Sequence, residues 1–262
     1  MRWWKQMGAG LVLAGVVLGQ AFAGTGGPVT EAALAQGFAN LDHARRTLDG
    51  AELKQVKAVF SQWVLSHPQD PRGHYGLART DLFLYNYYAH VVKNDPVQAE
   101  AAFTEAMKEA KIAAEMLPSN GQVHALLGRL YQIQASLHPI SSLLATVTTE
   151  SPVLTEFRQA LALDPDNLEA EIGLGTYCLF APKVAGGDRE RALRHFRRAA
   201  KLDPQDPEAL TWLAVAFREQ GDLGEARRDL DRALALDATY RFALNENLRL
   251  QQAESRRGDS SE

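Results

Sequence analysis

Among the side chains of this sequence that could bind a metal or take part in catalysis, the least common are seven histidines and one cysteine. The histidines stand singly along the chain, at His43, His67, His74, His90, His124, His138 and His195. None of them forms the His-x-x-x-His or His-Glu-x-x-His spacing that places two zinc ligands on one helix face. The sequence also contains neither the Gly-x-Ser-x-Gly turn of serine hydrolases nor a Gly-x-x-x-x-Gly-Lys phosphate loop. We therefore expect no metal, no cofactor and no catalytic activity.

The single cysteine, Cys178, excludes a disulfide within the chain. Because no residue near it in the sequence would activate its thiol, we interpret it as a small apolar core residue. Gly186 and Gly187 lack the lysine and hydroxyl of a phosphate loop, so a stretched turn between helices explains them better.

Residues 1–23 have the parts of a secretory signal peptide. Arg2 and Lys5 precede an apolar run over residues 7–19, and Ala21-Phe22-Ala23 has the pattern that signal peptidase reads. The run is shorter than the roughly 20 residues of a membrane-spanning helix, so retention as an anchor is the weaker interpretation. We predict cleavage after Ala23 and a periplasmic or secreted protein with no membrane insertion.

The composition is that of a folded protein, with 46% hydrophobic residues and a formal charge of −4. Removal of residues 1–23 leaves 26 basic and 32 acidic residues, so the charge becomes −6. This acidic excess gives no reason to expect binding to nucleic acid or to an anionic membrane.

Proline-containing segments recur along the chain and indicate helix ends. Residues 68–71 and 204–207 both read Pro-Gln-Asp-Pro, and each is followed seven residues later by an alanine, Ala78 or Ala214. From residue 208 to residue 237, small and apolar residues follow two helical periods separated by Gly221-Asp222. The pattern predicts a helix–turn–helix unit.

These residues resemble the tetratricopeptide repeat, a helix pair of about 34 residues. The pattern of that repeat is filled in the last unit by Leu210, Leu213, Ala214, Phe217, Ala226, Leu230 and Ala233. The preceding unit matches at Leu174, Gly175, Cys178, Ala192, Phe196, Ala199 and Pro204. The resemblance implies an all-α fold, a right-handed α-solenoid of antiparallel helix pairs.

Unit ends at Pro68, Pro118, Pro165, Pro204 and Ala238 divide the chain into repeats. We predict one solenoid over residues 24–254, with units of about 30–70, 71–120, 121–167, 168–206 and 207–240, a capping helix over 241–254 and a disordered polar tail over 255–262.

The spacings of these unit ends, 50, 47, 39 and 34 residues, show that the units lengthen toward the N-terminus. We predict long helices over 71–92 and 96–117, forming a hairpin that projects with an aromatic surface including Tyr85 and Tyr88. The apolar segment 140–147 is expected to pack on this hairpin. The residues that lengthen the next unit fall in a loop over 181–188.

The resemblance also implies a concave groove lined by the first helix of each unit. Together with the aromatic hairpin residues it suggests nine partner-binding side chains, Arg72, Tyr75, Arg79, Leu82, Tyr85, Tyr88, Arg129, Gln132 and Thr176. The arginines could hold a carboxylate or an acidic peptide by charge-assisted hydrogen bonds. Alternatively, they pair with glutamates of the chain itself or are solvated.

Two functions are compatible with these features. In the first, an exported scaffold or adaptor binds a protein or peptide partner through the groove and the aromatic hairpin. In the second, the solenoid binds a small ligand as an accessory of a periplasmic transport system. The loop with Ala181-Pro182 and Gly186-Gly187-Asp188 gives a weaker resemblance to the periplasmic component associated with tripartite (TRAP) transporters. The identity of a partner does not follow from the sequence.

Overall fold

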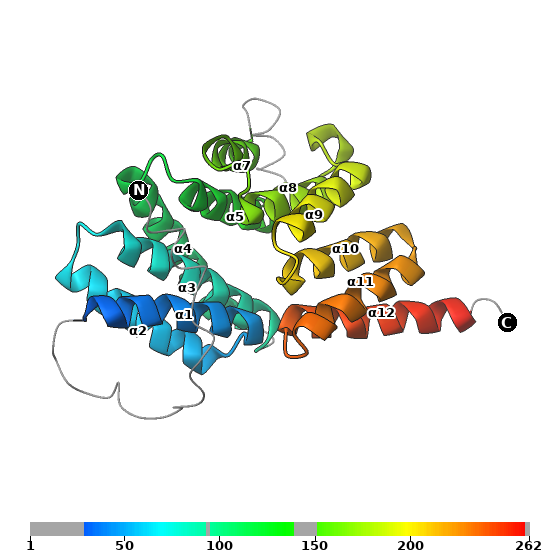
Figure 1. Cartoon of the computed structure of the whole chain (residues 1–262), viewed down its shortest axis with the longest axis horizontal. Coiled ribbons are helices and arrows are strands. Elements are labelled where there is room, and N and C mark those ends of the chain that lie inside the picture. Colours follow the sequence, from blue (N-terminus) through cyan, green and yellow to red (C-terminus); the bar gives the residue numbers. More distant parts are fainter. Residues whose placement is uncertain (1–28, 93–94, 139–150, 260–262) are drawn as a thin grey trace.

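The computed structural model describes residues 29–92, 95–138 and 151–259, and every regular element in these ranges is helical (Figure 1). The α-helices are α1 (Glu31–Thr47), α2 (Gly50–Ser66), α3 (Pro71–His90), α4 (Pro96–Met116), α5 (Gly121–Leu137), α7 (Pro152–Leu163), α8 (Leu168–Phe180), α9 (Arg189–Leu202), α10 (Pro207–Gln220), α11 (Leu223–Leu236) and α12 (Arg241–Asp259). A short 3₁₀ helix, η1 (Lys183–Ala185), lies between α8 and α9.

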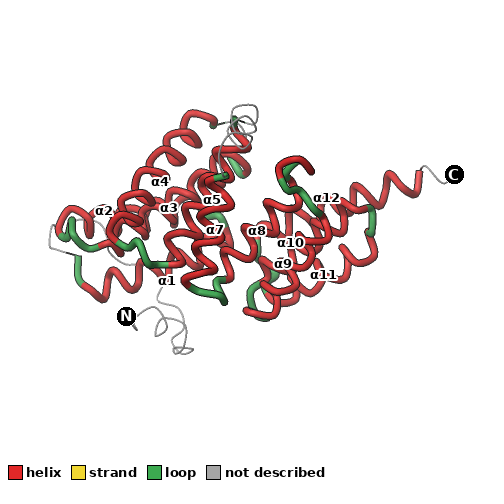
Figure 2. Tube along the Cα trace, turned by 90° about the horizontal axis from the view of Figure 1, so that it is seen from above, coloured by secondary structure: helices red, strands yellow, loops and turns green. Residues whose placement is uncertain are grey.

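The helices pack as successive pairs, α1–α2, α3–α4, α5–α7, α8–α9 and α10–α11, followed by α12. The first helix of each pair also contacts the first helix of the next, so α1, α3, α5, α8, α10 and α12 form a continuous layer. Figure 2 shows α7, α9 and α11 on one side of α5, α8 and α10. The all-α solenoid fold predicted from the sequence is thereby confirmed.

The helices begin at residues that supply a cap for free backbone N–H groups. The side chain accepts a backbone N–H at Thr30, Asp49, Asp70, Asp95, Asn120, Asn167, Asp188, Asp206 and Asp222. Proline occupies the first helical position of α3, α4, α7 and α10, where its missing N–H costs nothing. The recurring Asp-Pro segments are therefore the local cause of the helix starts.

Small residues allow the helices of each pair to approach closely. A Cβ atom at Gly175 of α8 would lie 2.4 Å from the ring of Phe196 of α9. The same relation joins Gly128 to Phe157, at 2.7 Å. Both phenylalanine side chains are fully buried, so each aromatic ring fills the space that its glycine leaves open.

A histidine–carboxylate pair joins the two helices of three consecutive units. Nδ1 of His74 lies 2.6 Å from a carboxylate oxygen of Glu109, and Nδ1 of His124 lies 2.6 Å from Glu156. In the next unit the residue types exchange places, and His195 of α9 bonds to Glu171 of α8 at 2.8 Å. These contacts assign the histidines to helix pairing.

The long hairpin predicted from the spacing is present, since α3 has 20 residues and α4 has 21, against 14 each in α10 and α11. Its aromatic side chains pack on the preceding pair. The ring of Tyr87 lies against Gly50 at the start of α2, and Lys54 lies 5.8 Å from the centroid of Tyr88. The segment 140–147, expected to pack on this hairpin, lies outside the described residues.

The C-terminal helix is longer than predicted. It continues to Asp259, five residues beyond the predicted end of the capping helix at residue 254. Within the extension, the side-chain hydroxyl of Ser255 donates to the backbone carbonyl of Gln251 at 3.0 Å. Among the described helices, none has the length and apolar character that a membrane crossing requires.

The chain curves until its two ends meet. Helix α1 contacts α12, and Figure 1 shows the first helix pair beside the start of the last helices. Tyr87 of α3 and Arg241 of α12 also line one cavity of about 390 Å³ together with the turn between α1 and α2. The solenoid is therefore closed on itself.

Candidate functional site

The N-terminal half of the predicted groove is filled by the chain itself. Tyr75 and Leu82 of α3 are each 2% exposed, because they belong to the core between α3, α4 and α5. Phe38 of α1 lies over Tyr75, with ring centroids 6.4 Å apart. These two predicted partner-binding residues therefore offer no open surface, and their prediction is corrected on the ground of burial.

Arg72 connects α3 to the start of α1. Its guanidinium donates to both carboxylate oxygens of Glu31, at 2.8 and 2.7 Å, and to Asp70 at 2.9 Å. Hydrogen bonds to Asp70 and then Glu31 raise the pKa of Arg72, so it remains a cation. Its positive charge is therefore paired with two carboxylates of the chain itself.

Tyr85 and Tyr88 are half-buried. The ring of Tyr85 lies 5.9 Å from that of Phe103 on α4, and burial raises the pKa of its hydroxyl. Tyr88 packs on Tyr87, with ring centroids 5.2 Å apart. The two tyrosines of the hairpin are therefore only partly open to a partner.

Three of the four remaining predicted residues come together at one cavity. Arg129 and Gln132 of α5 and Thr176 of α8 line a cavity of about 950 Å³. The amide nitrogen of Gln132 lies 3.0 Å from the hydroxyl of Thr176, which links α5 to α8 at the cavity wall. This is the part of the predicted groove that stays open.

Most other residues that line this cavity are apolar or aromatic. They are not among the nine predicted partner-binding residues. They come from Ile172 and Phe180 of α8, Trp212 of α10, and the loop that begins at Ala181 and Pro182. Phe180 is 58% exposed at the end of its helix. The loop 181–188 makes its unit longer than the usual repeat, and this extra length is the feature of the sequence from which a role of the loop and of Phe180 at the site could have been predicted.

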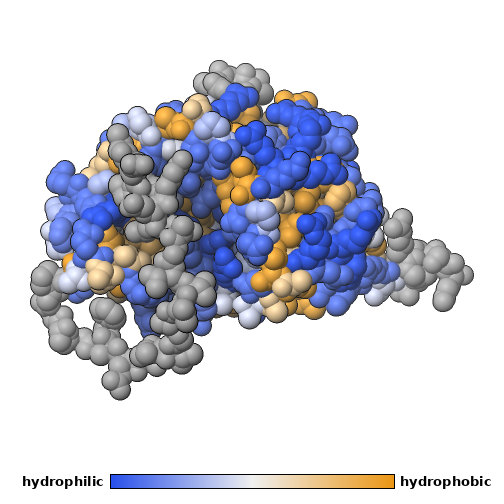
Figure 3. Space-filling view, in the orientation of Figure 1, coloured by the Kyte–Doolittle hydropathy of each residue, from blue (hydrophilic) through white to orange (hydrophobic). Residues whose placement is uncertain are grey.

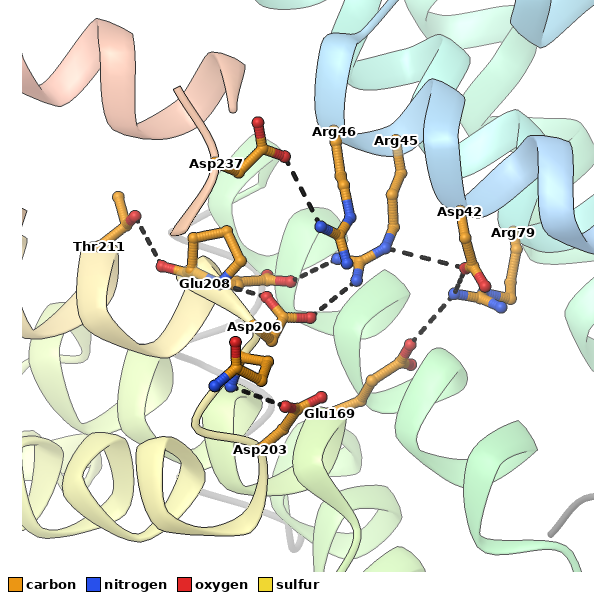
Figure 4. A network of polar contacts seen from close by, with 12 residues as sticks. Asp42, Arg45, Arg46, Arg79, Glu169, Asp203, Asp206, Glu208, Thr211 and Asp237 are labelled. Carbon is orange, nitrogen blue, oxygen red and sulfur yellow. Dashed lines mark hydrogen bonds and ion pairs between the residues drawn. The ribbon is translucent and has the colours of Figure 1, made fainter. Parts of the chain in front are cut away.

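An arginine–carboxylate network joins the first helix pair to the last (Figure 4). Arg45 of α1 bonds to Asp206 at 2.7 Å and to Glu208 at 3.2 Å, and Arg46 lies 3.6 Å from Asp237. Asp206 is also the N-cap of α10, since its other carboxylate oxygen accepts the backbone N–H of Glu208. Burial disfavours the charge on Asp206, but Arg45 outweighs burial and lowers the pKa of the carboxyl below its ordinary value.

Two further arginines extend the network across the concave face. Arg79 lies 3.5 Å from Asp42 of α1 and 3.5 Å from Glu169 of α8, while Arg129 lies 3.4 Å from Glu208. In this structure both arginines pair with acidic residues of the chain. This agrees with the alternative, raised from the sequence, that the groove arginines pair within the chain and not with a partner. Neither needs an external carboxylate for charge balance.

Within the described ranges, no group of three or more His, Cys, Asp and Glu side chains is placed to hold a metal ion. Cys178 is 1% exposed, in agreement with a core role. The arrangement is that of a binding site, with apolar walls and a few hydrogen-bonding groups.

The tetratricopeptide repeat family model matches residues 183–241. Over 47 residues, 18% of this chain, the sequence is 53% identical to the probable biofilm formation methyltransferase WspC of Pseudomonas putida. Over 97 residues, 37% of the chain, it is 29% identical to photosystem I assembly protein Ycf3 of Cyanophora paradoxa. The chain spans only 11% and 55% of the lengths of these two relatives.

A similar solved structure is that of a thermophilic tetratricopeptide repeat protein from Thermus thermophilus. The match has a TM-score of 0.60 and 19% sequence identity, and it covers 85% of this chain and 97% of the other. At this identity the likeness concerns the fold alone. The tetratricopeptide repeat match is thus confined to residues 183–241, and the described chain as a whole shares the fold of a tetratricopeptide repeat protein.

Proposed function

We propose that this chain is a non-catalytic binding protein that takes an apolar segment of a protein partner into the cavity between α5, α8 and α10. The cavity itself is the observation that carries the proposal. Its volume of about 950 Å³ lies within the range of about 300–1,000 Å³ in which proteins bind ligands. It lies on the concave layer of first helices, the surface that solenoids use for extended partners.

The chemistry of the walls supports a peptide as the occupant. Ile172, Phe180 and Trp212 supply apolar contact area for hydrophobic side chains. The amide of Gln132 and the hydroxyl of Thr176 each both donate and accept, so they can bond to a peptide backbone once their mutual bond opens. A scaffold role also accords with the name of the relative Ycf3, an assembly protein.

Export is part of the proposal and rests on residues 1–23. Their basic start, apolar run and small-x-small end are those of a signal peptide. N-terminal sequencing of the protein recovered outside the cytoplasm should then begin at Gly24. A first residue of Met1 in that fraction would contradict cleavage.

The binding proposal is tested with the mature chain, residues 24–262, which keeps every described helix. A photo-crosslinking amino acid in place of Ala135 at the cavity should capture a protein from the cell envelope. A peptide from the crosslinked segment should bind the purified chain, and Ala135→Trp should abolish that binding by filling the cavity. Ala235→Trp on the exposed face of α11 is the matched control and should leave binding unchanged.

Two outcomes would contradict this proposal. If Ala135→Trp and Ala235→Trp bound the peptide equally well, the cavity would not be the site. If no protein were crosslinked while a small organic molecule raised the melting temperature of the chain, the competing hypothesis of a small-ligand protein would replace it.

A further inference from the structure

A second surface, distinct from the cavity walls on α5 and α10, is concentrated on helix α9. Its 14 residues include five arginines and one lysine but a single glutamate, Glu190. Ala192, Leu193, Phe196 and Ala199 form the buried face of the helix. The cations therefore share the opposite, solvent-facing side, in the layer formed by α7, α9 and α11 (Figure 2).

Within the described residues, most of these cations have no ion pair at close range, although Arg191 and Arg194 interact electrostatically with Asp188 at the start of the helix. Arg198 bonds to Glu171 at 3.1 Å, and Arg197 lies over the ring of Phe217. The remaining four have no ion pair within the described ranges, namely Arg189, Arg191, Arg194 and Lys201. From residue 183 to residue 201, seven basic residues stand against two acidic ones, although the whole chain carries a net charge of −4.

Exposed apolar side chains lie at the N-terminal end of this helix. Val184 in η1 is 88% exposed, and Phe180 is 58% exposed. The loop that carries Val184 is held in place, because the hydroxyl of Tyr177 donates to the carbonyl of Ala185 at 2.6 Å and the N–H of Gly187 donates to that of Pro182. Figure 3 shows hydrophobic surface near this loop next to hydrophilic surface over α8 and α9.

We propose that the loop 180–185 and the exposed face of α9 together bind the surface of an anionic phospholipid bilayer. Cations are attracted to the phosphate head groups, and an adjacent apolar side chain gains by leaving water for the acyl boundary. Arg191, Arg194 and Arg198 follow one another at spacings of three and four residues, so they share one face of α9. This proposal goes beyond the peptide-binding function and does not depend on it.

A lipid surface fits the patch better than a nucleic acid or an acidic protein segment. Each of those partners would use the cations. Phe180 is the aromatic side chain of the patch on which a base could stack, but Val184, the most exposed apolar side chain of the patch, has no π-face. Neither cavity described above takes a lining residue from α9, so an acidic peptide would meet no groove along that helix, and only the loop side of the surface adjoins the larger cavity. Val184 stands beside Lys183 in the sequence, so an apolar and a basic side chain could contact the acyl boundary and the head groups of a bilayer together.

The test uses the mature chain, because the apolar run of residues 7–19 would partition into lipid by itself. Co-sedimentation should show binding to vesicles with about one third phosphatidylglycerol but not to pure phosphatidylcholine vesicles, and added salt should weaken it. Arg191→Glu with Arg194→Glu should reduce the affinity about tenfold or more. Lys54→Glu with Lys111→Glu makes the same charge change on exposed positions of α2 and α4 and should reduce it far less.

The apolar contribution is tested separately at Val184, since Phe180 also lines the cavity. Val184→Ser should weaken vesicle binding several-fold, while Leu65→Ser, at an equally exposed position of α2, should not. Circular dichroism confirms that each variant is folded. Equal losses in the paired charge variants would overturn the proposal, as would binding to heparin or RNA without binding to vesicles.

Discussion

At the residue scale, three of the seven histidines, His74, His124 and His195, are structural groups that connect the two helices of a repeat. His74 and His124 lie six residues after a unit-ending proline, and in the next unit that position holds Glu171. Their partners Glu109 and Glu156 lie nine residues before the next unit-ending proline. In the following unit that position holds a histidine, His195, which bonds to Glu171. An exchange of both members keeps the interaction, which shows that the pair and not either residue is what the fold requires.

His195 makes the stability of this protein dependent on pH. Hydrogen bonds to Cys178 and to Glu171 raise the pKa of His195 to about 9, above its ordinary value of about 6.5. Folding thus favours the protonated ring, so the stabilisation is complete below about pH 6.5 and is lost as the pH rises through about 9. Because the ring is partly open to water, we expect a loss of about 1–2 kcal/mol. Urea unfolding of the native protein should show this decline, and His195→Gln should remove most of it; an identical decline in both proteins would contradict the assignment.

At the element scale, close packing of helix pairs depends on the absence of a side chain at particular glycines. Gly175 is in the interior of α8, where alanine has the better helix propensity by about 1 kcal/mol. The ring of Phe196 occupies the space in which that methyl group would lie. Packing between elements therefore outweighs the preference of the single helix.

Gly175→Ala should destabilise the protein by about 1–3 kcal/mol, because Phe196 must shift in a filled core. Gly224→Ala in α11 is the matched control, since the nearest atom to its added Cβ lies 3.9 Å away. That variant should be neutral or slightly more stable. Thermal unfolding of both variants distinguishes packing from propensity, and a stabilised Gly175→Ala protein would refute the packing argument.

At the scale of the whole molecule, the closure of the solenoid depends on charges rather than on an apolar interface between its ends. Arg45 has a side chain only 15% exposed and reaches residues more than 160 positions away in the sequence. Since Asp206 and Glu208 are themselves buried, loss of the arginine would leave carboxylates without their main partner. Opening of the ring would return these carboxylates to water.

Arg45→Ala should therefore keep the helical content but increase the radius of gyration in small-angle scattering and speed amide exchange in α1. Asp206→Asn separates the two uses of this side chain, since asparagine still caps α10 but loses the charge that holds Arg45. It should open the ring while α10 stays protected. Arg228→Ala on α11 removes an exposed surface pair with Glu225 and should change neither measurement. An unchanged radius for both Arg45→Ala and Asp206→Asn would show that closure has another cause.

Much of the fold follows from local signals in the sequence. The Asp-Pro segments, the capping residues and the spacing of small residues predict the helix pairs, and the ends of α3 and α4 differ by at most two residues from the predicted ones. The positions of Arg129, Gln132 and Thr176 on a common concave surface also follow from the repeat pattern.

The closed state of the molecule does not follow from the sequence, because it depends on curvature summed over all the units. Whether Tyr75 is open to a partner is decided by Phe38 of the first helix, and whether Arg79 is free is decided by Glu169, which is 90 residues away. The histidine partners are a different case. Their constant distances from the unit-ending prolines were visible in the sequence and would have identified Glu109 and Glu156.

The closing contact between Arg45 and Asp206 also bears on how this protein can evolve. A solenoid with free ends can gain a helix pair by duplication, because each unit contacts only its neighbours. Here an added pair would carry α1 away from α10 and separate the arginine from its carboxylates. The number of repeats is thus restricted by the ring, and changes in length among descendants of this gene should accumulate in loops such as 181–188.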